Sequence, residues 1–324
     1  MNYRALGDTG LRVSEIGFGT WGLGGDSGGA VAYGPVNDDT SRAALQLALD
    51  QGINFYDTSD LYGFGHSEQI LGEAFSTCRH EVIIASKGGF VDAGRQDFSV
   101  SHLRRAVEES LRRLRTDYID LYQFHSPAVS LLQEQPEGVG LMNELKAAGK
   151  IRAWGFSARS PDEALMAVEE FSPPVIQVNF SLVDQRAKSV GLFDLCLNRK
   201  IGVIIRTPLC FGFLSGHEVA QQELNSSDHR RSWSPEQCRR WAEAGSEFSA
   251  AFQPLPGQTS AQMALRYCLS YPGVSTVIPG MLTAQHVSEN TGASDLGPLM
   301  CVELQRIENL YESRTYFIKD LRPT

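Results

Sequence analysis

The chain has 324 residues, of which 42% are apolar and 21% are charged, and its formal net charge is −9 at pH 7. These proportions are typical of a folded globular protein and exclude a disordered or fibrous chain. The acidic balance and the lack of a run of basic residues argue against nucleic acid and anionic membrane surfaces as partners. Length alone fits two average domains or one large α/β barrel.

The cysteines and the N-terminal segment indicate the compartment. Six cysteines are widely spaced and form no C-x-x-C pair, a pattern typical of free thiols that pack as small hydrophobic groups. Residues 1–11 are polar and lack the apolar core of a signal peptide, and no run of 18 apolar residues occurs. We therefore expect a reduced, cytoplasmic protein without a membrane segment.

The order of apolar and amphipathic segments predicts the fold. Residues 3–16 contain two short extended pieces around an Asp/Gly turn, which predicts a β-hairpin. Short apolar runs then alternate with amphipathic segments, which is the βα repeat of a parallel sheet. The expected strands are 16–19, 53–57, 82–87, 119–125, 151–157, 175–179, 202–206 and 274–278. The expected helices are 38–51, 67–76, 99–114, 138–148, 161–170, 190–199, 260–269 and 283–292, with one more at 300–311.

Eight βα pairs without a linker predict a single domain, residues 1–324, folded as a (β/α)8 TIM barrel. The N-terminal β-hairpin is expected to cover one end, and residues 208–259 form a long loop insertion after strand 7. A doubly wound sheet is the alternative, because Gly17–Gly22 matches G-x-G-x-x-G. A Rossmann fingerprint opens a helix at once, whereas here residues 22–35 intervene before the helix at Asp38, so the barrel is favoured.

Ionisable side chains follow three neighbouring strands. Asp57 ends one strand, Lys87 the next and His125 the third, and Tyr62 lies in the loop five residues after Asp57. Each residue alone would be interpreted as a strand-end cap, a surface charge or a core histidine. In a barrel, however, the C-terminal strand ends meet at one mouth, so the four side chains are expected together.

These four residue types are suited to proton transfer to a carbonyl oxygen. A tyrosine alone has a pKa of about 10, but a nearby lysine ammonium favours the phenolate, and an aspartate keeps the lysine charged. A histidine adds a donor that can orient and polarise the substrate oxygen. The set needs no metal, and a metal-dependent hydrolase is the weaker interpretation, because it would need clustered His and Asp ligands.

The chain resembles the aldo-keto reductase superfamily over nearly its whole length. The matching motifs are Gly17-Phe18-Gly19-Thr20-Trp21, Phe55-Tyr56-Asp57-Thr58, Tyr62-Gly63, Ala85-Ser86-Lys87, Asp120 to His125, Gly155-Phe156-Ser157, Ile176-Gln177-Val178-Asn179, Pro208-Leu209, Gly212 to Gly216, Ile278-Pro279-Gly280 and Glu289-Asn290. The resemblance implies a (β/α)8 barrel that binds a nicotinamide dinucleotide without a Rossmann motif.

The resemblance also implies residue roles. Tyr62 matches the general acid, Lys87 and Asp57 its partners, and His125 the residue that orients the substrate; Trp21, Tyr62 and His125 match the substrate pocket. Ser157 and Gln177 match the positions that hold the nicotinamide carboxamide. The positions that match cofactor contacts are Thr20, Trp21, Asp57, Ser157, Gln177, Arg206, Thr207, Pro208, Leu209, Gly212, Leu214, Gly216, Ile278, Gly280, Gln285, Glu289 and Asn290.

The chain departs from the family pattern in three places. Ala158 stands where an asparagine often follows the serine, and Arg206 stands where an aromatic residue often stacks on the nicotinamide. After Gly280, Met281 and Leu282 replace the usual Arg or Lys that grips the 2′-phosphate; Thr283, Gln285 or His286 are the possible substitutes. We expect NADPH as the cofactor, with NADH as the alternative.

The expected function is NAD(P)H-dependent reduction of an aldehyde or ketone to an alcohol, or the reverse, on a small-molecule substrate. Hydride would leave C4 of the nicotinamide while Tyr62 acts as the general acid. The alternative from another class is a dinucleotide-binding sensor or regulatory subunit with little turnover, as in family members attached to ion channels.

Overall fold

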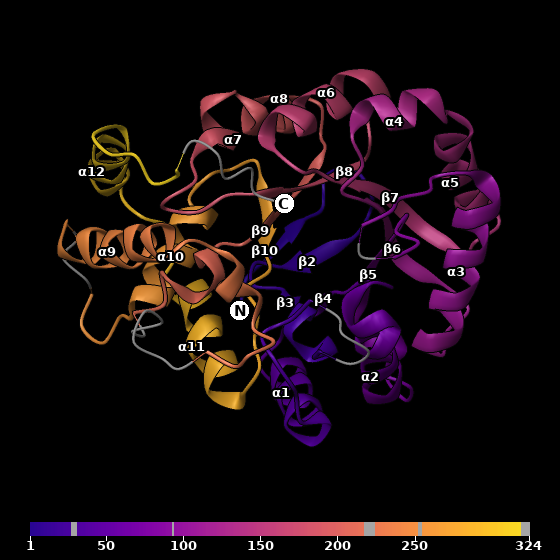
Figure 1. The fold of residues 1–324 in the computed structure, drawn as a ribbon, viewed down its shortest axis with the longest axis horizontal. Coiled ribbons are helices and arrows are strands. Elements are labelled where there is room, and N and C mark those ends of the chain that lie inside the picture. The colour runs from indigo at the N-terminus through magenta and orange to yellow at the C-terminus, as the bar shows by residue number, and fades with distance from the viewer. Residues whose placement is uncertain (27–30, 93, 217–223, 252–254, 319–324) are drawn as a thin grey trace.

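Eight parallel strands form the centre of the molecule. The computed structural model describes residues 1–26, 31–92, 94–216, 224–251 and 255–318. The strands neighbour one another in sequence order and are β3 (Phe18–Gly19), β4 (Phe55–Asp57), β5 (Ile83–Gly88), β6 (Ile119–His125), β7 (Ile151–Ser157), β8 (Val175–Asn179), β9 (Gly202–Arg206) and β10 (Val274–Val277). Parallel bridges from Ile16 to Val277 and from Gly19 to Gly280 join the first strand region to the last. The predicted (β/α)8 barrel is therefore confirmed (Figure 1).

Helices surround the strands on the outside (Figure 1). They are α1 (Asp38–Asp50), α2 (His66–Ala74), α3 (Val100–Leu114), α4 (Val129–Glu134), α5 (Glu137–Ala147), α6 (Pro161–Phe171), α7 (Arg186–Ser189), α8 (Leu192–Asn198), α10 (Ser260–Leu269), α11 (Ala284–Asp295) and α12 (Cys301–Glu312). Side chains of Asn37, Ser99, Ser160, Thr259 and Thr283 accept hydrogen bonds from backbone N–H groups in the first turns of five of these helices. These caps explain why the helices begin close to the expected positions.

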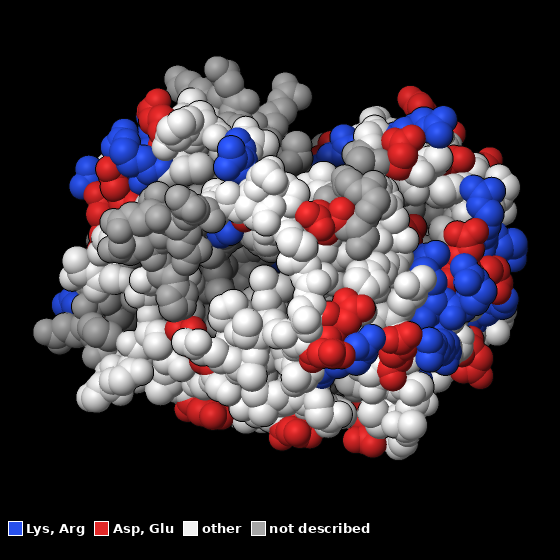
Figure 2. All heavy atoms as spheres, turned by 60° about the horizontal axis from the view of Figure 1, so that its bottom comes forward, with Lys and Arg blue, Asp and Glu red and all other residues white. Residues whose placement is uncertain are grey.

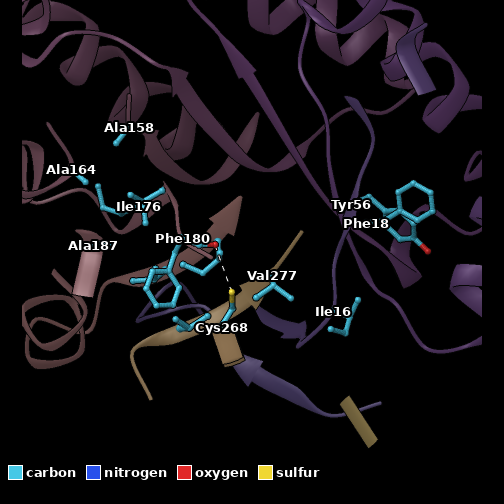
Figure 3. Packing of buried hydrophobic residues seen from close by; sticks show 14 of the residues in the cluster. Ile16, Phe18, Tyr56, Ala158, Ala164, Ile176, Phe180, Ala187, Cys268 and Val277 are labelled. Carbon is cyan, nitrogen blue, oxygen red and sulfur yellow. Dashed lines mark hydrogen bonds between the residues drawn. The ribbon is translucent and has the colours of Figure 1, made fainter. Parts of the chain in front are cut away.

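The main hydrophobic core lies between the strands and the helices. On α3, the buried side chains Leu103, Val107, Leu111 and Leu114 recur at helical spacing and face the sheet. Figure 3 shows another part of the same cluster, where Phe180, after β8, accepts a weak hydrogen bond from the Cys268 thiol of α10. The apolar strands and the apolar sides of the amphipathic helices thus pack against each other in one core.

The N-terminal hairpin closes the end of the barrel at which the strands begin. Strands β1 (Tyr3–Ala5) and β2 (Arg12–Ser14) pair antiparallel, as predicted. Leu6 and Val13 are fully buried in a second apolar cluster. Its other fully or mostly buried members are Phe55, Ala85, Leu121, Ala153, Val175, Ile204 and Ile278. Gly7 has φ +56°, and a Cβ there would lie 2.3 Å from the Gly202 nitrogen, so the hairpin can approach β9 only with a glycine at this position.

The insertion after β9 is present, but it is more than a loop. It contains α9 (Pro235–Ala251), whose buried residues Gln237, Trp241, Ala244 and Phe248 recur at helical spacing. The sequence contains this periodicity, but the Gln, Ser, Gly and Pro content of the segment favoured the prediction of a loop. Residues 217–223 and 252–254 of the insertion lie outside the described residues.

The surface carries both signs of charge. On the face drawn in Figure 2, basic and acidic side chains are intermixed, and no broad basic patch gathers there. Pairs such as Arg104 with Glu144 and Arg115 with Glu73 link neighbouring helices. In the part of the chain that the structure describes, no helix has the length and apolarity needed to span a membrane.

The hairpin contact gives a test of stability. Replacing Leu6 by Ala removes a fully buried side chain from the closed end of the barrel, so the free energy of unfolding should fall by about 2–5 kcal/mol. Leu197→Ala, on α8 and half exposed, should lower it by less than about 1 kcal/mol. Urea denaturation followed by circular dichroism measures both. Equal effects of the two changes would show that the hairpin does not stabilise the barrel.

Candidate active site

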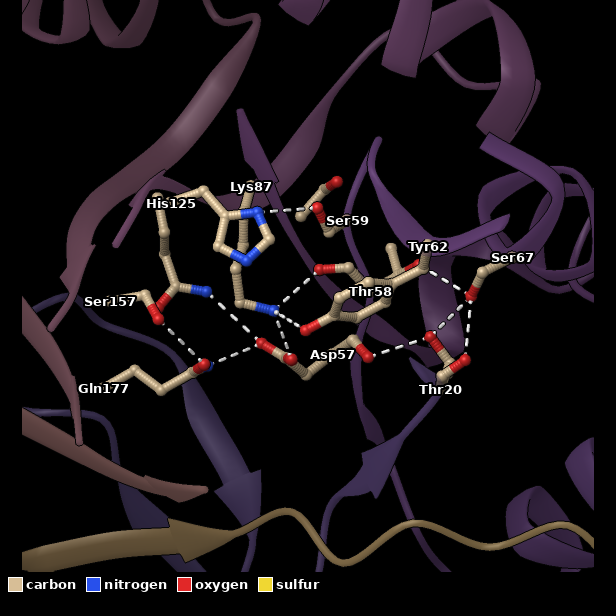
Figure 4. A network of polar contacts seen from close by, with 12 residues as sticks. Thr20, Asp57, Thr58, Ser59, Tyr62, Ser67, Lys87, His125, Ser157 and Gln177 are labelled. Carbon is tan, nitrogen blue, oxygen red and sulfur yellow. Dashed lines mark hydrogen bonds and ion pairs between the residues drawn. The ribbon is translucent and has the colours of Figure 1, made fainter. Parts of the chain in front are cut away.

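The Lys87 ammonium is the centre of a polar cluster at the C-terminal ends of the strands. Its Nζ atom donates to Asp57 Oδ1 at 2.5 Å, to the Thr58 carbonyl at 2.9 Å and to Tyr62 Oη at 3.1 Å (Figure 4). An ammonium has three N–H groups, so all three are engaged by the last residue of β4 and the segment that follows it. The Lys87 side chain is buried, which makes these bonds necessary.

Charge on Lys87 is maintained by its neighbours. Burial acts to lower the pKa of Lys87, but the Asp57 carboxylate and the Tyr62 oxygen outweigh it, and the lysine pKa is raised above its ordinary value. The ammonium therefore stays protonated across the physiological range.

The second oxygen of Asp57 organises the neighbouring strands. Asp57 Oδ2 accepts from Gln177 Nε2 at 2.7 Å and from Gln123 Nε2 at 3.3 Å. Ser157 donates its hydroxyl to Gln177 Oε1 at 3.2 Å (Figure 4). One buried carboxylate thus connects the ends of β4, β5, β6 and β8, and through Gln177 the end of β7.

Backbone geometry after β4 brings Tyr62 over the strand ends. Tyr62 begins a short 3-10 turn, Tyr62–Gly65, and Gly63 within it has φ +58°. A Cβ on Gly63 would lie 2.2 Å from the Gly24 carbonyl oxygen, so a glycine is required where the two loops touch. The Tyr62 ring meets His125 edge to face, with ring centroids 5.9 Å apart.

His125 ends β6 and is 8% exposed. Its Nδ1 atom lies 3.0 Å from Ser59 Oγ, and Nε2 makes no hydrogen bond to any residue that the structure describes. In Figure 4 the Nε2 side of the ring faces the ends of Lys87 and Tyr62. Burial and the charges of Lys87 and Arg206 lower the pKa of His125 well below its ordinary value, so the imidazole is neutral.

The structure therefore brings together Asp57, Tyr62, Lys87 and His125, as the sequence predicted. It also places residues that the sequence analysis did not single out. Gln123 contacts Asp57, and Ser59 contacts both His125 and the Asp60 carboxylate. The only signal for Ser59 and Asp60 was their place between Asp57 and Tyr62.

The residues expected to contact a cofactor fall into three groups around the same end of the barrel. The first group lies on β7, β8 and β9 and contains Ser157, Gln177 and Arg206. Arg206 Nη2 donates to the Ala158 carbonyl at 2.8 Å, whereas its buried Nε has no partner among the described residues. Burial lowers the pKa of Arg206.

The second group is the start of the insertion. Thr207 has φ +56° and donates its hydroxyl to Asn179 Oδ1 at 3.0 Å. The chain then turns through Gly212, with φ +96°, towards an exposed Gly216. The rest of this group lies along the same turn; Pro208 and Leu214 are buried, and Leu209 is half-buried.

The third group follows β10. Ile278 is buried and Gly280 exposed, and a Cβ on Gly280 would meet open space. Gln285, Glu289 and Asn290 lie on α11, where Gln285 is exposed, Glu289 half-buried and Asn290 buried.

Two of the residues expected to contact the cofactor, Thr20 and Trp21, use their polar side-chain atoms in hydrogen bonds within the protein. The buried Thr20 hydroxyl donates to the Asp57 carbonyl at 2.9 Å and lies 2.7 Å from Ser67 Oγ, so it supports the end of β4. Trp21 Nε1 donates to the Val31 carbonyl at 3.0 Å.

An aromatic wall stands beside this end of the barrel and includes Trp21, which the family resemblance placed in the substrate pocket. Trp21 and Tyr33, from the first loop, pack on His229 of the insertion, with centroids 4.5 and 4.7 Å away. Phe211 and Trp233 extend the wall, 4.6 Å apart. Two segments far apart in the chain thus form one surface.

The part of the chain that the structure describes contains no candidate metal centre. Among the residues that the structure describes, no three His, Cys, Asp or Glu side chains are grouped closely enough to hold a metal ion.

Comparisons with known proteins agree with this geometry. The model of the aldo/keto reductase family matches residues 15–312. The chain is 32% identical over 310 residues to the aldo-keto reductase YhdN of Bacillus subtilis, covering 90% of this chain and 89% of the relative. It is 33% identical over 297 residues to L-galactose dehydrogenase of Arabidopsis thaliana, covering 90% and 87% of the two chains.

A solved structure extends the similarity to the whole fold. The holo form of the aldo-keto reductase AKR11C1 from Bacillus halodurans superposes with a TM-score of 0.79 at 29% identity, covering 99% of each chain. The match over nearly the whole length, together with the barrel, shows that this chain belongs to the aldo/keto reductase family.

Proposed function

We propose that this protein is an NAD(P)H-dependent oxidoreductase that reduces an aldehyde or ketone to an alcohol, or catalyses the reverse, with Tyr62 as the general acid. Membership of the family supports carbonyl oxidoreduction in general. The observation that carries the finer proposal is the buried Lys87 ammonium, which donates to Tyr62 Oη and to Asp57.

In reduction, the Tyr62 hydroxyl donates its proton to the carbonyl oxygen of the substrate. The phenolate that results is stabilised by the Lys87 N–H, 3.1 Å away, and Asp57 keeps that lysine charged. In oxidation the same phenolate accepts the proton of the alcohol. His125 Nε2, on the same side, contacts the substrate oxygen.

A nicotinamide dinucleotide fits the residues around the cluster. The buried Nε of Arg206, which has no partner among the described residues, leaves a donor for a polar ligand, and Arg206 also contacts Ala158, next to Ser157. When bound, the dinucleotide supplies the hydride. Ser157 and Gln177 would hold its carboxamide, and Pro208 to Gly216 would lie over its pyrophosphate. Helix α11 would contact its adenine through Glu289 and Asn290.

NADPH is the proposed cofactor on family grounds, and NADH is the alternative. Residues 278–292 contain no Lys or Arg. Leu282 packs towards Gly22, where an added Cβ would lie 2.4 Å from its Cδ2 atom. The segment therefore offers no bidentate cation for a 2′-phosphate.

Removing the tyrosine hydroxyl tests the general acid. Tyr62→Phe should lower kcat for reduction of a panel of aldehydes and ketones by about 10²–10⁴-fold, because the phenylalanine ring has no proton to transfer to the substrate oxygen, while cofactor affinity changes little. Lys87→Met should give a similar loss. Tyr118→Phe is the matched control, since Tyr118 lies before β6 and packs under Arg79 and Arg152. Undiminished turnover of Tyr62→Phe would refute the assignment.

Titration with NADPH and NADH tests the cofactor. Trp21 should report binding through quenching of tryptophan fluorescence, and we expect micromolar affinity for at least one of the two, a range usual for enzyme ligands. The ratio of the two dissociation constants shows whether a 2′-phosphate is recognised. Folded protein that binds neither would contradict the proposed function; tight binding without turnover would favour the regulatory alternative.

A further inference from the structure

Three side chains behind the proposed general acid form a continuous hydrogen-bonded chain. Ser59 Oγ lies 3.1 Å from Asp60 Oδ1 and 3.0 Å from His125 Nδ1. It also accepts the Leu61 N–H at 3.1 Å. Ser59 is fully buried and His125 nearly so, whereas Asp60 is half-buried at the outer end.

The hydrogen-bonding capacity of Ser59 couples its two neighbours. A hydroxyl donates one hydrogen bond and accepts two. The Leu61 N–H takes one acceptor position, which leaves one donor and one acceptor for Asp60 and His125. If Ser59 donates to Asp60, it accepts a hydrogen bond from His125 Nδ1–H; if it donates to Nδ1, it accepts a hydrogen bond from the protonated Asp60 carboxyl group.

We propose that Ser59 and Asp60 are positioning residues that set the tautomer of His125, and so decide whether Nε2 donates to or repels the substrate oxygen. The inference rests on the function proposed above. With Asp60 protonated, Asp60 donates to Ser59, Ser59 donates to Nδ1, and Nε2 carries the imidazole hydrogen. With Asp60 ionised, Ser59 donates to the carboxylate, Nδ1–H donates to Ser59, and Nε2 presents a lone pair.

The two states differ by one proton. On protonation, Nε2 takes a proton from solvent, the Nδ1 proton moves to Ser59 Oγ, and the Ser59 proton moves to Asp60. Every donor and acceptor of the three groups at these contacts stays paired in both states. No oxidation or reduction accompanies the change.

Asp60 is the member that titrates near neutrality. Burial raises the pKa of Asp60 to about 7, assisted by Glu68 of α2, while Ser59, Arg113 of α3 and the Leu61 N–H act in the opposite direction. Glu68 is itself paired with Arg113 at 2.6 Å. The other groups facing Asp60 are the Tyr122 phenol of β6 and the Lys87 carbonyl of β5, to which the Asp60 N–H donates.

His125 does not compete for this titration. Burial, Lys87 of β5 and Arg206 of β9 keep its pKa well below the ordinary value. The Tyr62 and Phe90 rings pack on it edge to face. Because the imidazole is neutral near pH 7, it carries a single N–H hydrogen, either on Nδ1 or on Nε2.

The two protonation states of Asp60 determine how carbonyl reduction changes with pH. Below about pH 7 Asp60 is protonated and Nε2–H donates to the carbonyl oxygen, so reduction is favoured. Above it, the Nε2 lone pair faces that oxygen, and kcat/KM for reduction should fall by up to about tenfold per pH unit.

The decisive measurement is the tautomer of His125 in the full chain labelled with ¹⁵N in its histidine rings. Two-bond ¹H–¹⁵N spectra at about pH 5.5 and about pH 8.5, on either side of the ordinary histidine range, identify the protonated nitrogen, and His125→Gln assigns the signal. In the unmodified protein the hydrogen should move from Nε2 to Nδ1. Asp60→Asn has no titrating proton and should show no change. Asp39→Asn, an exposed carboxylate on α1, should switch as the unmodified protein does.

The pH profile of kcat/KM for carbonyl reduction is the second readout. The limb near pH 7 should be absent in Asp60→Asn and in Ser59→Ala, and present in Asp39→Asn. The spectra do not depend on turnover, so a failed proposed function and a failed relay are distinguishable. The same tautomer at both pH values in the unmodified protein, or a switch that survives Asp60→Asn, would overturn the inference.

Discussion

The buried contact between the Lys87 ammonium and the Asp57 carboxylate is the interaction on which the rest of the site depends. Removing two such charges from water is expensive, and their attraction offsets the penalty only when the remaining donors and acceptors are also satisfied. The other N–H groups of Lys87 reach Thr58 and Tyr62, and the second oxygen of Asp57 reaches Gln123 and Gln177. The remaining hydrogen bonds of this ion pair therefore fix the positions of Thr58, Tyr62, Gln123 and Gln177 at the open end of the barrel.

The two ends of the barrel differ in the polarity of their side chains. At the closed end, Leu6 and Val13 of the hairpin fill the interior with apolar side chains. At the open end, polar side chains extend from neighbouring strands, and Thr20 and Ser67 hold the Asp57 backbone in place. Apolar packing at the closed end therefore lies apart from the buried charged groups, which are at the open end.

Protonation differs sharply among side chains that almost touch. Lys87 is kept charged by its anionic partner, whereas His125 is kept neutral by burial and by the same lysine. The pKa of Asp60, one residue beyond Ser59, is raised to about 7, because burial and then the Glu68 charge oppose its ionisation. The environment of each group, and not its residue type, determines which of them can respond to pH.

The sequence by itself determined the barrel, because strand length, helix periodicity and capping residues are local properties that recur eight times. It also predicted that Asp57, Lys87 and His125 meet, since the C-terminal ends of parallel strands share one edge. Only the tertiary structure decided which loops touch. The contacts of Ser59 with His125, and of Trp21 and Tyr33 with His229, join segments distant in the chain. The helical spacing of α9 is a local property, but only the structure shows that its Trp241 and Phe248 side chains pack into the main core. Such contacts depend on how irregular loops fold in space, and no local period encodes that.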